Sequence, residues 1–136
     1  MLILAILVSV ALFDLAVLHM LWGFGFWFPI RDEPKLVAAV IGARGVDRMP
    51  GPIPCGVVSA LLLIVLIVLW GAASWLQAAI IYGAAAVFIL RGGMSYLPLW
   101  RKMTPQEPFA TYDRRIYGPL CLGLGVGLGL IQCVGF

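Results

Sequence analysis

The chain has 136 residues, of which 63% are hydrophobic and 11% are charged, and its formal net charge is +3. Together with a mean hydropathy of +1.08, this composition excludes a water-soluble domain, because too few polar side chains are present to cover its surface. Lipid is the solvent that remains, and we expect a single membrane domain over residues 1–136.

Four continuous apolar runs are long enough to cross a hydrocarbon core, which takes about 20 helical residues. Because the runs do not alternate between apolar and polar residues, they predict helices rather than the strands of a barrel. The spans are expected at about residues 2–24, 53–70, 75–90 and 117–136. The predicted fold class is therefore all-α, an integral membrane four-helix bundle.

The first run has an alternative interpretation as a signal peptide. It lacks a basic start, and it ends in aromatic residues around Trp22 rather than in a small-residue cleavage site. We therefore interpret it as a span.

Asp14 is the only acidic residue within a predicted span, and it lies past the middle of the first one. A charged carboxylate at that depth is costly unless it is paired, so an intramembrane acid is a candidate functional residue. Two interpretations stay open. One is a role in proton, ion or ligand binding; the other is a structural hydrogen bond to a backbone carbonyl or to Ser59, Gln77 or Tyr82.

His19 is the only histidine of the chain. Five residues turn a helix by about 140°, so His19 and Asp14 do not share a face. An axial ligand to haem or to a pigment requires only one such imidazole. The alternative is a packed interface residue beside Trp22.

The loop after the first span is expected to contain a short interfacial helix on the inner leaflet, with its apolar side towards lipid. Asp32 can cap this helix, and Glu33 and Pro34 suit its first turn. Gly42 and Gly45 can end it. Four basic side chains, which lie in the loops after the first and third spans, are expected to contact anionic lipid headgroups, namely Lys35, Arg44, Arg101 and Lys102.

All nine basic residues lie in two loops, one after the first span and one after the third. Short loops rich in Lys and Arg stay on the cytoplasmic side of a bilayer. We therefore expect both loops in the cytoplasm, both termini outside, and the cell inner membrane as the location. Anionic lipids satisfy the positive charge, and no nucleic acid is required.

The fourth run carries glycine at every second position, at Gly123, Gly125, Gly127 and Gly129. Glycine lets another backbone approach closely. Packing within the bundle is one interpretation of this stripe, and contact with a partner subunit is the other.

No arrangement for metal binding or nucleophilic catalysis is visible in the sequence. Cys55, Cys121 and Cys133 show no CxxC spacing, and a single histidine does not complete a tetrahedral site. We expect the cysteines to pack as small apolar residues, and we expect no metal, no cofactor and no catalytic residue.

Short landmarks lie at the ends of the predicted spans. His19-Met-Leu-Trp22-Gly23 closes the first span, Met49-Pro50 precedes the second, and Arg91-Gly92-Gly93 follows the third. Phe109…Asp113-Arg114-Arg115-Ile-Tyr117-Gly-Pro119-Leu-Cys121-Leu leads into the glycine-rich run. In these landmarks, over nearly its whole length, the chain resembles the DUF3995 family of small bacterial four-helix membrane proteins. The resemblance implies a four-span fold and a bacterial inner membrane, but no activity.

Three hypotheses for function remain. The first is a non-enzymatic accessory subunit that packs against other membrane proteins through its fourth helix. The second is a binder or isomerase of a small hydrophobic ligand, with Asp14 or His19 in a cavity of the bundle. The third is a small proton-coupled transporter with its acid in the first span, although such transporters have short loops and little charge bias.

Overall fold

Residues 1–135 are described by a computed structural model, and every regular element within them is a helix. Four helices are long and apolar enough to cross a membrane. Three are α1 (Leu2–Gly23), α3 (Pro52–Leu69) and α4 (Trp75–Met94). The fourth runs over Phe109–Val134, and it consists of α6 (Phe109–Tyr112), a π-helical turn η1 (Asp113–Tyr117) and α7 (Gly118–Val134). The predicted all-α fold class is confirmed, and insertion into a membrane is inferred from length and composition.

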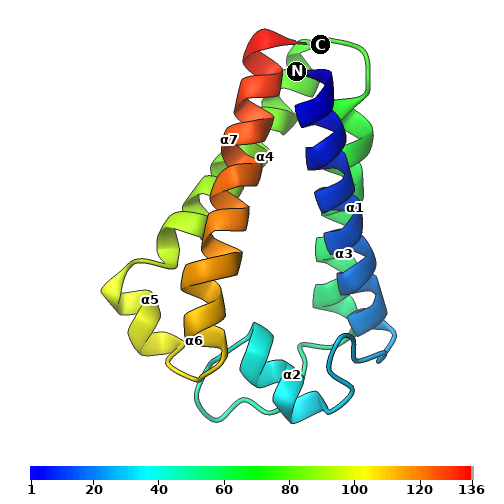
Figure 1. Ribbon diagram of the computed structural model, residues 1–136. Coiled ribbons are helices and arrows are strands. Elements are labelled where there is room, and N and C mark those ends of the chain that lie inside the picture. The colour runs from blue at the N-terminus through cyan, green and yellow to red at the C-terminus, as the bar shows by residue number, and fades with distance from the viewer. Residues whose placement is uncertain (136) are drawn as a thin grey trace.

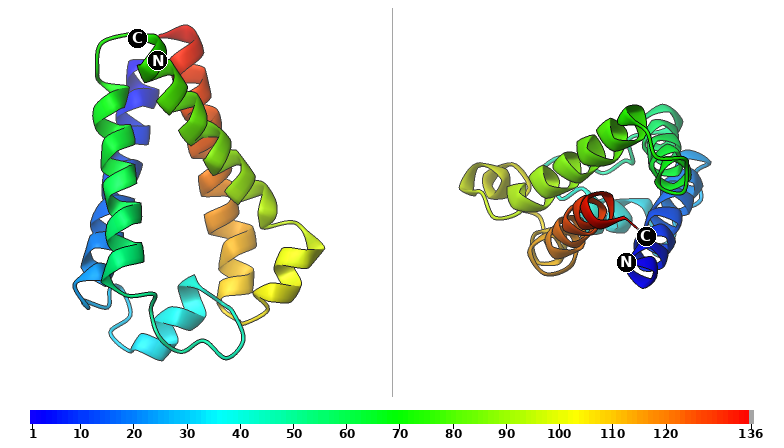
Figure 2. Two further views of the ribbon diagram at one scale, coloured as in Figure 1. Left: turned by 180° about the vertical axis from the view of Figure 1, so that it is seen from behind. Right: turned by 90° about the horizontal axis from the view of Figure 1, so that it is seen from above.

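The long helices form two pairs, α1 with α3 and α4 with α7 (Figure 1). The pairs lie against each other near the N-terminus and the end of α7, and they diverge towards the opposite end (Figures 1 and 2). There α2 (Glu33–Val40) lies between the pairs, and α5 (Pro98–Met103) lies beside the α4–α7 pair. Both basic loops are therefore at one end of the molecule, which we call the basic end.

The hydrophobic core lies where the two pairs meet. It is formed by buried side chains from all four long helices, namely Ala5, Val8, Leu12, Ala16, Leu62, Leu69, Ile81, Ala85, Leu124, Leu128 and Ile131. One buried polar group joins α1 to α3, because the Ser59 hydroxyl donates a hydrogen bond to the Ala16 carbonyl at 2.8 Å. In lipid, packing and such hydrogen bonds hold helices together, since burying apolar surface gives little advantage.

The short helix predicted in the first loop is present. The Asp32 carboxylate accepts a hydrogen bond from the Lys35 amide at 3.3 Å, and Gly42 ends the segment with a φ of 71°. The expectation that its apolar side faces lipid is not met, because Leu36 and Val37 are buried within the protein. They pack in a second cluster with Trp22, Met49 and Cys55, so the ends of α1 and α3 cover this face.

The third and fourth long helices are longer than the apolar runs suggested. α4 continues through Arg91 to Met94, and the last helix begins at Phe109 instead of residue 117. The apolar runs end where charged residues begin, and for this reason the sequence predicted shorter helices. In the structure Arg91 of α4 pairs with Asp113 of the last helix, so both helices continue through their charged residues.

Candidate functional site

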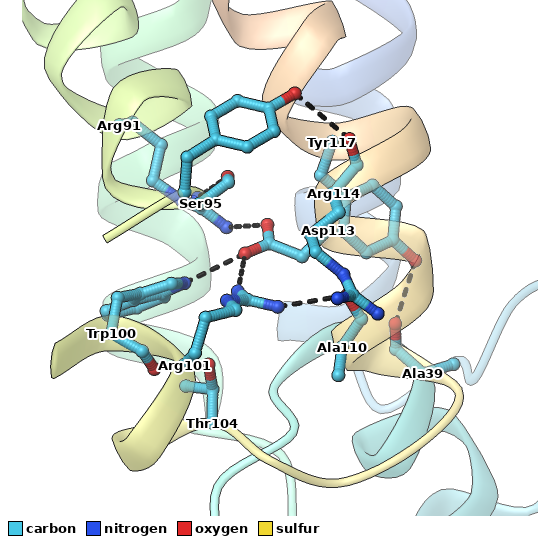
Figure 3. A network of polar contacts seen from close by, with 11 residues as sticks. Ala39, Arg91, Ser95, Trp100, Arg101, Thr104, Ala110, Asp113, Arg114 and Tyr117 are labelled. Atoms are coloured by element: carbon cyan, nitrogen blue, oxygen red, sulfur yellow. Dashed lines mark hydrogen bonds and ion pairs between the residues drawn. The ribbon is translucent and has the colours of Figure 1, made fainter. Parts of the chain in front are cut away.

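Asp113 is a fully buried carboxylate at the basic end of the α4–α7 pair. Its Oδ1 accepts a hydrogen bond from Arg91 Nη2 at 2.7 Å, and its Oδ2 accepts one from Trp100 Nε1 at 2.8 Å (Figure 3). Arg101 Nη2 forms a second ion pair with Oδ2. A buried charge is tolerated when it is paired and hydrogen-bonded in this way. We call Asp113, Arg91, Trp100 and Arg101 the Asp113 cluster.

The π-helical turn explains how Asp113 is positioned. The Gly118 amide bonds to the Asp113 carbonyl five residues earlier, and Pro119 has no amide hydrogen. The Arg114 carbonyl is therefore left without a helical donor. The Tyr96 hydroxyl donates to this carbonyl at 3.0 Å, so a residue that follows α4 compensates for the irregular turn that Pro119 imposes.

The same region is tied to α2. The Tyr117 hydroxyl donates to the Ala39 carbonyl at 2.8 Å, where α2 ends and its carbonyls lack helical partners (Figure 3). The backbone N–H of Gln106 donates a hydrogen bond to the Gly42 carbonyl at 3.0 Å. A Cβ at Gly42 would overlap the Phe109 ring, so glycine is needed here for close approach as well as for its positive φ.

The Asp113 cluster was not predicted from the sequence. Arg101 was expected at lipid headgroups, but its side chain is only 20% exposed and it pairs with Asp113. The sequence did contain one signal for a paired Asp113. Asp113 is one of only two acids in the basic segment after α4, and it lies shortly before Pro119 at the start of the glycine-rich run. Of the other predicted headgroup contacts, Lys35, Arg44 and Lys102 are exposed.

Asp14 lies on the face of α1 that points away from the other helices. The buried residues of α1, Ala5, Val8, Leu12 and Ala16, occupy the opposite face. The carboxyl is exposed, and no hydrogen bond or ion pair joins it to any residue from 1 to 135. Two predicted partners are engaged elsewhere: Ser59 bonds to Ala16, and the Tyr82 hydroxyl lies 3.2 Å from Cys133 Sγ.

An apolar hollow of about 420 Å³ surrounds Asp14 on this outer face. It is lined mainly by α1 itself, including Phe13, Val17 and Leu21, and closed at one side by Phe28. Asp14 is therefore the only polar side chain in an otherwise apolar surface at the middle of a span.

His19 lies on a different face from Asp14, as predicted, and close to Trp22. The two rings are 5.0 Å apart between centroids in an edge-to-face arrangement. His19 Nδ1 lies 2.7 Å from the Leu15 carbonyl, and because a carbonyl only accepts, Nδ1 is the donor. The structure brings His19 into a small cavity with residues of α2 and α3.

The four glycines of the α7 stripe have two different kinds of surroundings. A Cβ at Gly125 would lie 2.8 Å from the Ala85 carbonyl of α4, and one at Gly127 would lie 3.0 Å from Val8 of α1. Gly123 and Gly129 have nothing within 4 Å of such an atom. Half of the stripe thus packs within the bundle, and the other half does not.

Comparison with known families gives a match. The profile of the family described as protein of unknown function (DUF3995) matches residues 12–128. The chain belongs to this family. Neither a search of curated proteins nor a search of solved structures gave a match.

The landmarks that resemble the DUF3995 family gather in two places in the fold. Arg91, Asp113 and Tyr117 belong to the Asp113 cluster or to its connection with α2. His19, Trp22, Met49 and Pro50 line the cavity between α1, α2 and α3. The landmarks on which the resemblance rests thus lie mainly at the basic end.

Proposed function

We propose that this protein is a non-enzymatic accessory subunit that packs against another membrane protein through the outward face of α1. One observation carries the proposal: the exposed Asp14 carboxyl, at mid-span and without a partner among residues 1–135. An acid in that position costs several kcal/mol when it faces hydrocarbon. A partner helix that covers the face and donates a hydrogen bond removes this cost.

The chemistry of the partner follows from the charge distribution of this chain. All nine basic residues lie at the basic end, in the loops or in the helix ends next to them, so a second copy in the same orientation brings no Lys or Arg to the depth of Asp14. A different protein is favoured, with a spanning helix that carries a basic side chain or an amide donor at mid-depth. Its surface next to the donor is apolar, to match Phe13, Val17 and Leu21.

The sequence alone suggested the fourth helix as the docking surface, and the packing now favours the first. Within the glycine stripe, Gly125 and Gly127 are the two that make close contacts, and both contacts are internal. Gly123 and Gly129 leave open space but offer no polar group. The Asp14 carboxyl has no hydrogen-bond partner in the described chain, and apolar side chains surround it.

The proposal includes a location and an orientation. We propose the cell inner membrane, with the basic end in the cytoplasm and both termini outside, since short basic loops stay inside. The location of both loops at one end supports this orientation (Figure 1). Lys35, Arg44 and Lys102 are exposed there and would contact anionic headgroups.

Site-directed photo-crosslinking in cells tests the docking face. A photoreactive residue at Leu7, two turns from Asp14 on the same face and 62% exposed, is expected to give one discrete adduct. The matched control is Val87 on α4, which is 65% exposed. Asp14→Leu is expected to reduce the Leu7 adduct at least several-fold, while Asp14→Asn, which keeps a hydrogen-bonding group, reduces it less.

Three outcomes would count against the proposal. The first is a stable monomer without an adduct from Leu7, and the second is an adduct that Asp14→Leu leaves unchanged. The third is an adduct of twice the mass of this chain, which would mean that a second copy covers the face. Retained elution volume of the Asp14→Leu variant in detergent shows that a loss of adduct is not a loss of folding.

A second candidate function, binding of a small hydrophobic ligand, is favoured by the cavity beside His19. Asp14 does not take part in it, because it lies on the other side of α1. The outward direction of Asp14 also lowers the support for a proton-coupled transporter, which would need this acid to face a path through the protein.

A further inference from the structure

A small cavity lies between α1, α2 and α3 at the basic end, on a different side of α1 from Asp14. Its volume is about 190 Å³. The wall from α1 is His19 and Trp22, the wall from α3 includes Pro54 and Val58, and the segment Met49-Pro50 lines the remaining side of this partly open cavity. The cavity is therefore built from three separate parts of the chain, and it is independent of the docking face proposed above.

The lining is apolar apart from the His19 imidazole and the Cys55 thiol. The polar edge of Trp22 is turned to another partner, because its Nε1 donates to the Phe28 carbonyl at 2.8 Å. His19 Nδ1 donates to Leu15, so in the neutral ring the proton is on Nδ1 and Nε2 carries a free lone pair. Nε2 lies at the end of the ring away from the backbone of α1, and no hydrogen bond to it from residues 1–135 is present.

Size and lining together indicate the class of ligand. An apolar cavity of about 150 Å³ binds benzene, so this cavity has room for one six-membered ring with a substituent. Flat apolar groups of Trp22, Pro50 and Pro54 line it, and the Met49 sulfur suits contact with an aromatic ring. The single strong acceptor requires a donor on that ring.

We propose that this cavity binds a phenolic ring, with the phenol hydroxyl donating a hydrogen bond to His19 Nε2. Such a ring is carried by the head of a membrane quinol or by a small free phenol. The basic end places the cavity near headgroup level, where an amphipathic ring of either origin concentrates. The role of His19 is binding and orientation, and no chemical step is assigned to it.

Fluorine NMR with the full chain in lipid nanodiscs tests the proposal, using 4-fluorophenol and 4-fluorotoluene as probes and empty nanodiscs as background. Protein-dependent binding of 4-fluorophenol is expected. Val58→Phe fills the cavity and is expected to abolish it, whereas Val57→Phe, one position along α3 and outside the lining, leaves it unchanged.

The imidazole is tested by two substitutions. His19→Phe keeps a ring but removes the acceptor, and we expect it to weaken 4-fluorophenol about 3- to 10-fold, which is the net value of one hydrogen bond. His19→Gln retains an acceptor at the far end of the side chain and restores most of the affinity. Binding of 4-fluorotoluene, which lacks the hydroxyl, is the same for both variants.

Competition assigns the source of the ring. Displacement of 4-fluorophenol by a quinol with a short isoprenoid tail indicates a lipid-borne ring, and displacement by free phenol alone indicates a small soluble one. The proposal is overturned if no binding depends on the protein, if Val57→Phe and Val58→Phe act alike, or if His19→Phe leaves both probes unaffected. The last result would mean that the cavity accepts any apolar group, such as an acyl chain.

Discussion

Two carboxylates of this chain, Asp113 and Asp14, have opposite surroundings. Asp113 is fully buried and receives hydrogen bonds from Arg91, Arg101 and Trp100. Asp14 is exposed at mid-span and receives none from residues 1–135. The first acid completes the structure of the α4–α7 pair, whereas the second has no hydrogen-bond partner in the described part of the chain. The comparison separates a residue that stabilises the fold from one that we propose to mediate assembly.

The largest expected effect is that of Asp113→Asn. The substitution keeps the shape of the side chain but leaves two guanidinium groups without a counter-charge, and we expect it to lower the free energy of unfolding by about 3–5 kcal/mol. Steric trapping in bicelles measures this quantity. If the variant does not insert, the double variant with Arg101→Leu, which removes one of the unpaired charges, is expected to recover part of the loss.

Asp47→Asn is the matched control, because Asp47 is exposed in the first basic loop. We expect a change within about 0.5 kcal/mol for this surface substitution. A similarly small loss for Asp113→Asn would show that the ion pairs contribute little, and the contrast between the two acids would fail.

The close contact between α4 and the last helix gives the next effect. A Cβ at Gly92 would lie 2.8 Å from the Gly118 carbonyl and 2.6 Å from Leu122 Cγ. Because backbone cannot yield easily, Gly92→Ala is expected to reduce the free energy of unfolding by about 1–3 kcal/mol. The same steric-trapping measurement applies.

The neighbouring glycine provides the control. Gly93 has nothing within 4 Å of an added Cβ, and Gly93→Ala should stabilise α4 by up to about 1 kcal/mol through helix propensity. Equal effects of the two alanines would indicate that the helices are not in close contact at the basic end.

The sequence predicted the four long helices and α2 because these depend on local signals, namely continuous apolar runs and the Asp32 cap. It did not predict the Asp113 cluster, whose ion pairs join residues 22 and 12 positions apart. Those pairs exist only once α4 and α5, which carry Arg91 and Arg101, lie beside the last helix. The direction of Asp14 was also not predictable, since a span that is apolar all round has no stripe to mark its buried face.

The link between α2 and the last helix gives a smaller effect. Tyr117→Phe removes the hydrogen bond to the Ala39 carbonyl, and we expect a loss of about 0.5–1.5 kcal/mol. Tyr112→Phe is the control, because Tyr112 is 39% exposed and its hydroxyl has no hydrogen bond to the described part of the chain. Faster hydrogen exchange in α2 for Tyr117→Phe alone would show that the hydroxyl holds α2 in place.

Asp14→Asn is expected to have the smallest effect on folding. It is the same type of change, aspartate to asparagine, as Asp113→Asn, which has the largest. Because Asp14 contacts no charged group of the described chain, its replacement should change the free energy of unfolding of the isolated protein by less than about 0.5 kcal/mol. Steric trapping of the purified chain in bicelles measures this change. A large decrease in the free energy of unfolding would show that Asp14 stabilises the bundle itself, and it would remove the reason for a partner at α1. A negligible change, combined with a weaker Leu7 crosslink in cells, assigns the carboxyl to assembly and completes the contrast with Asp113.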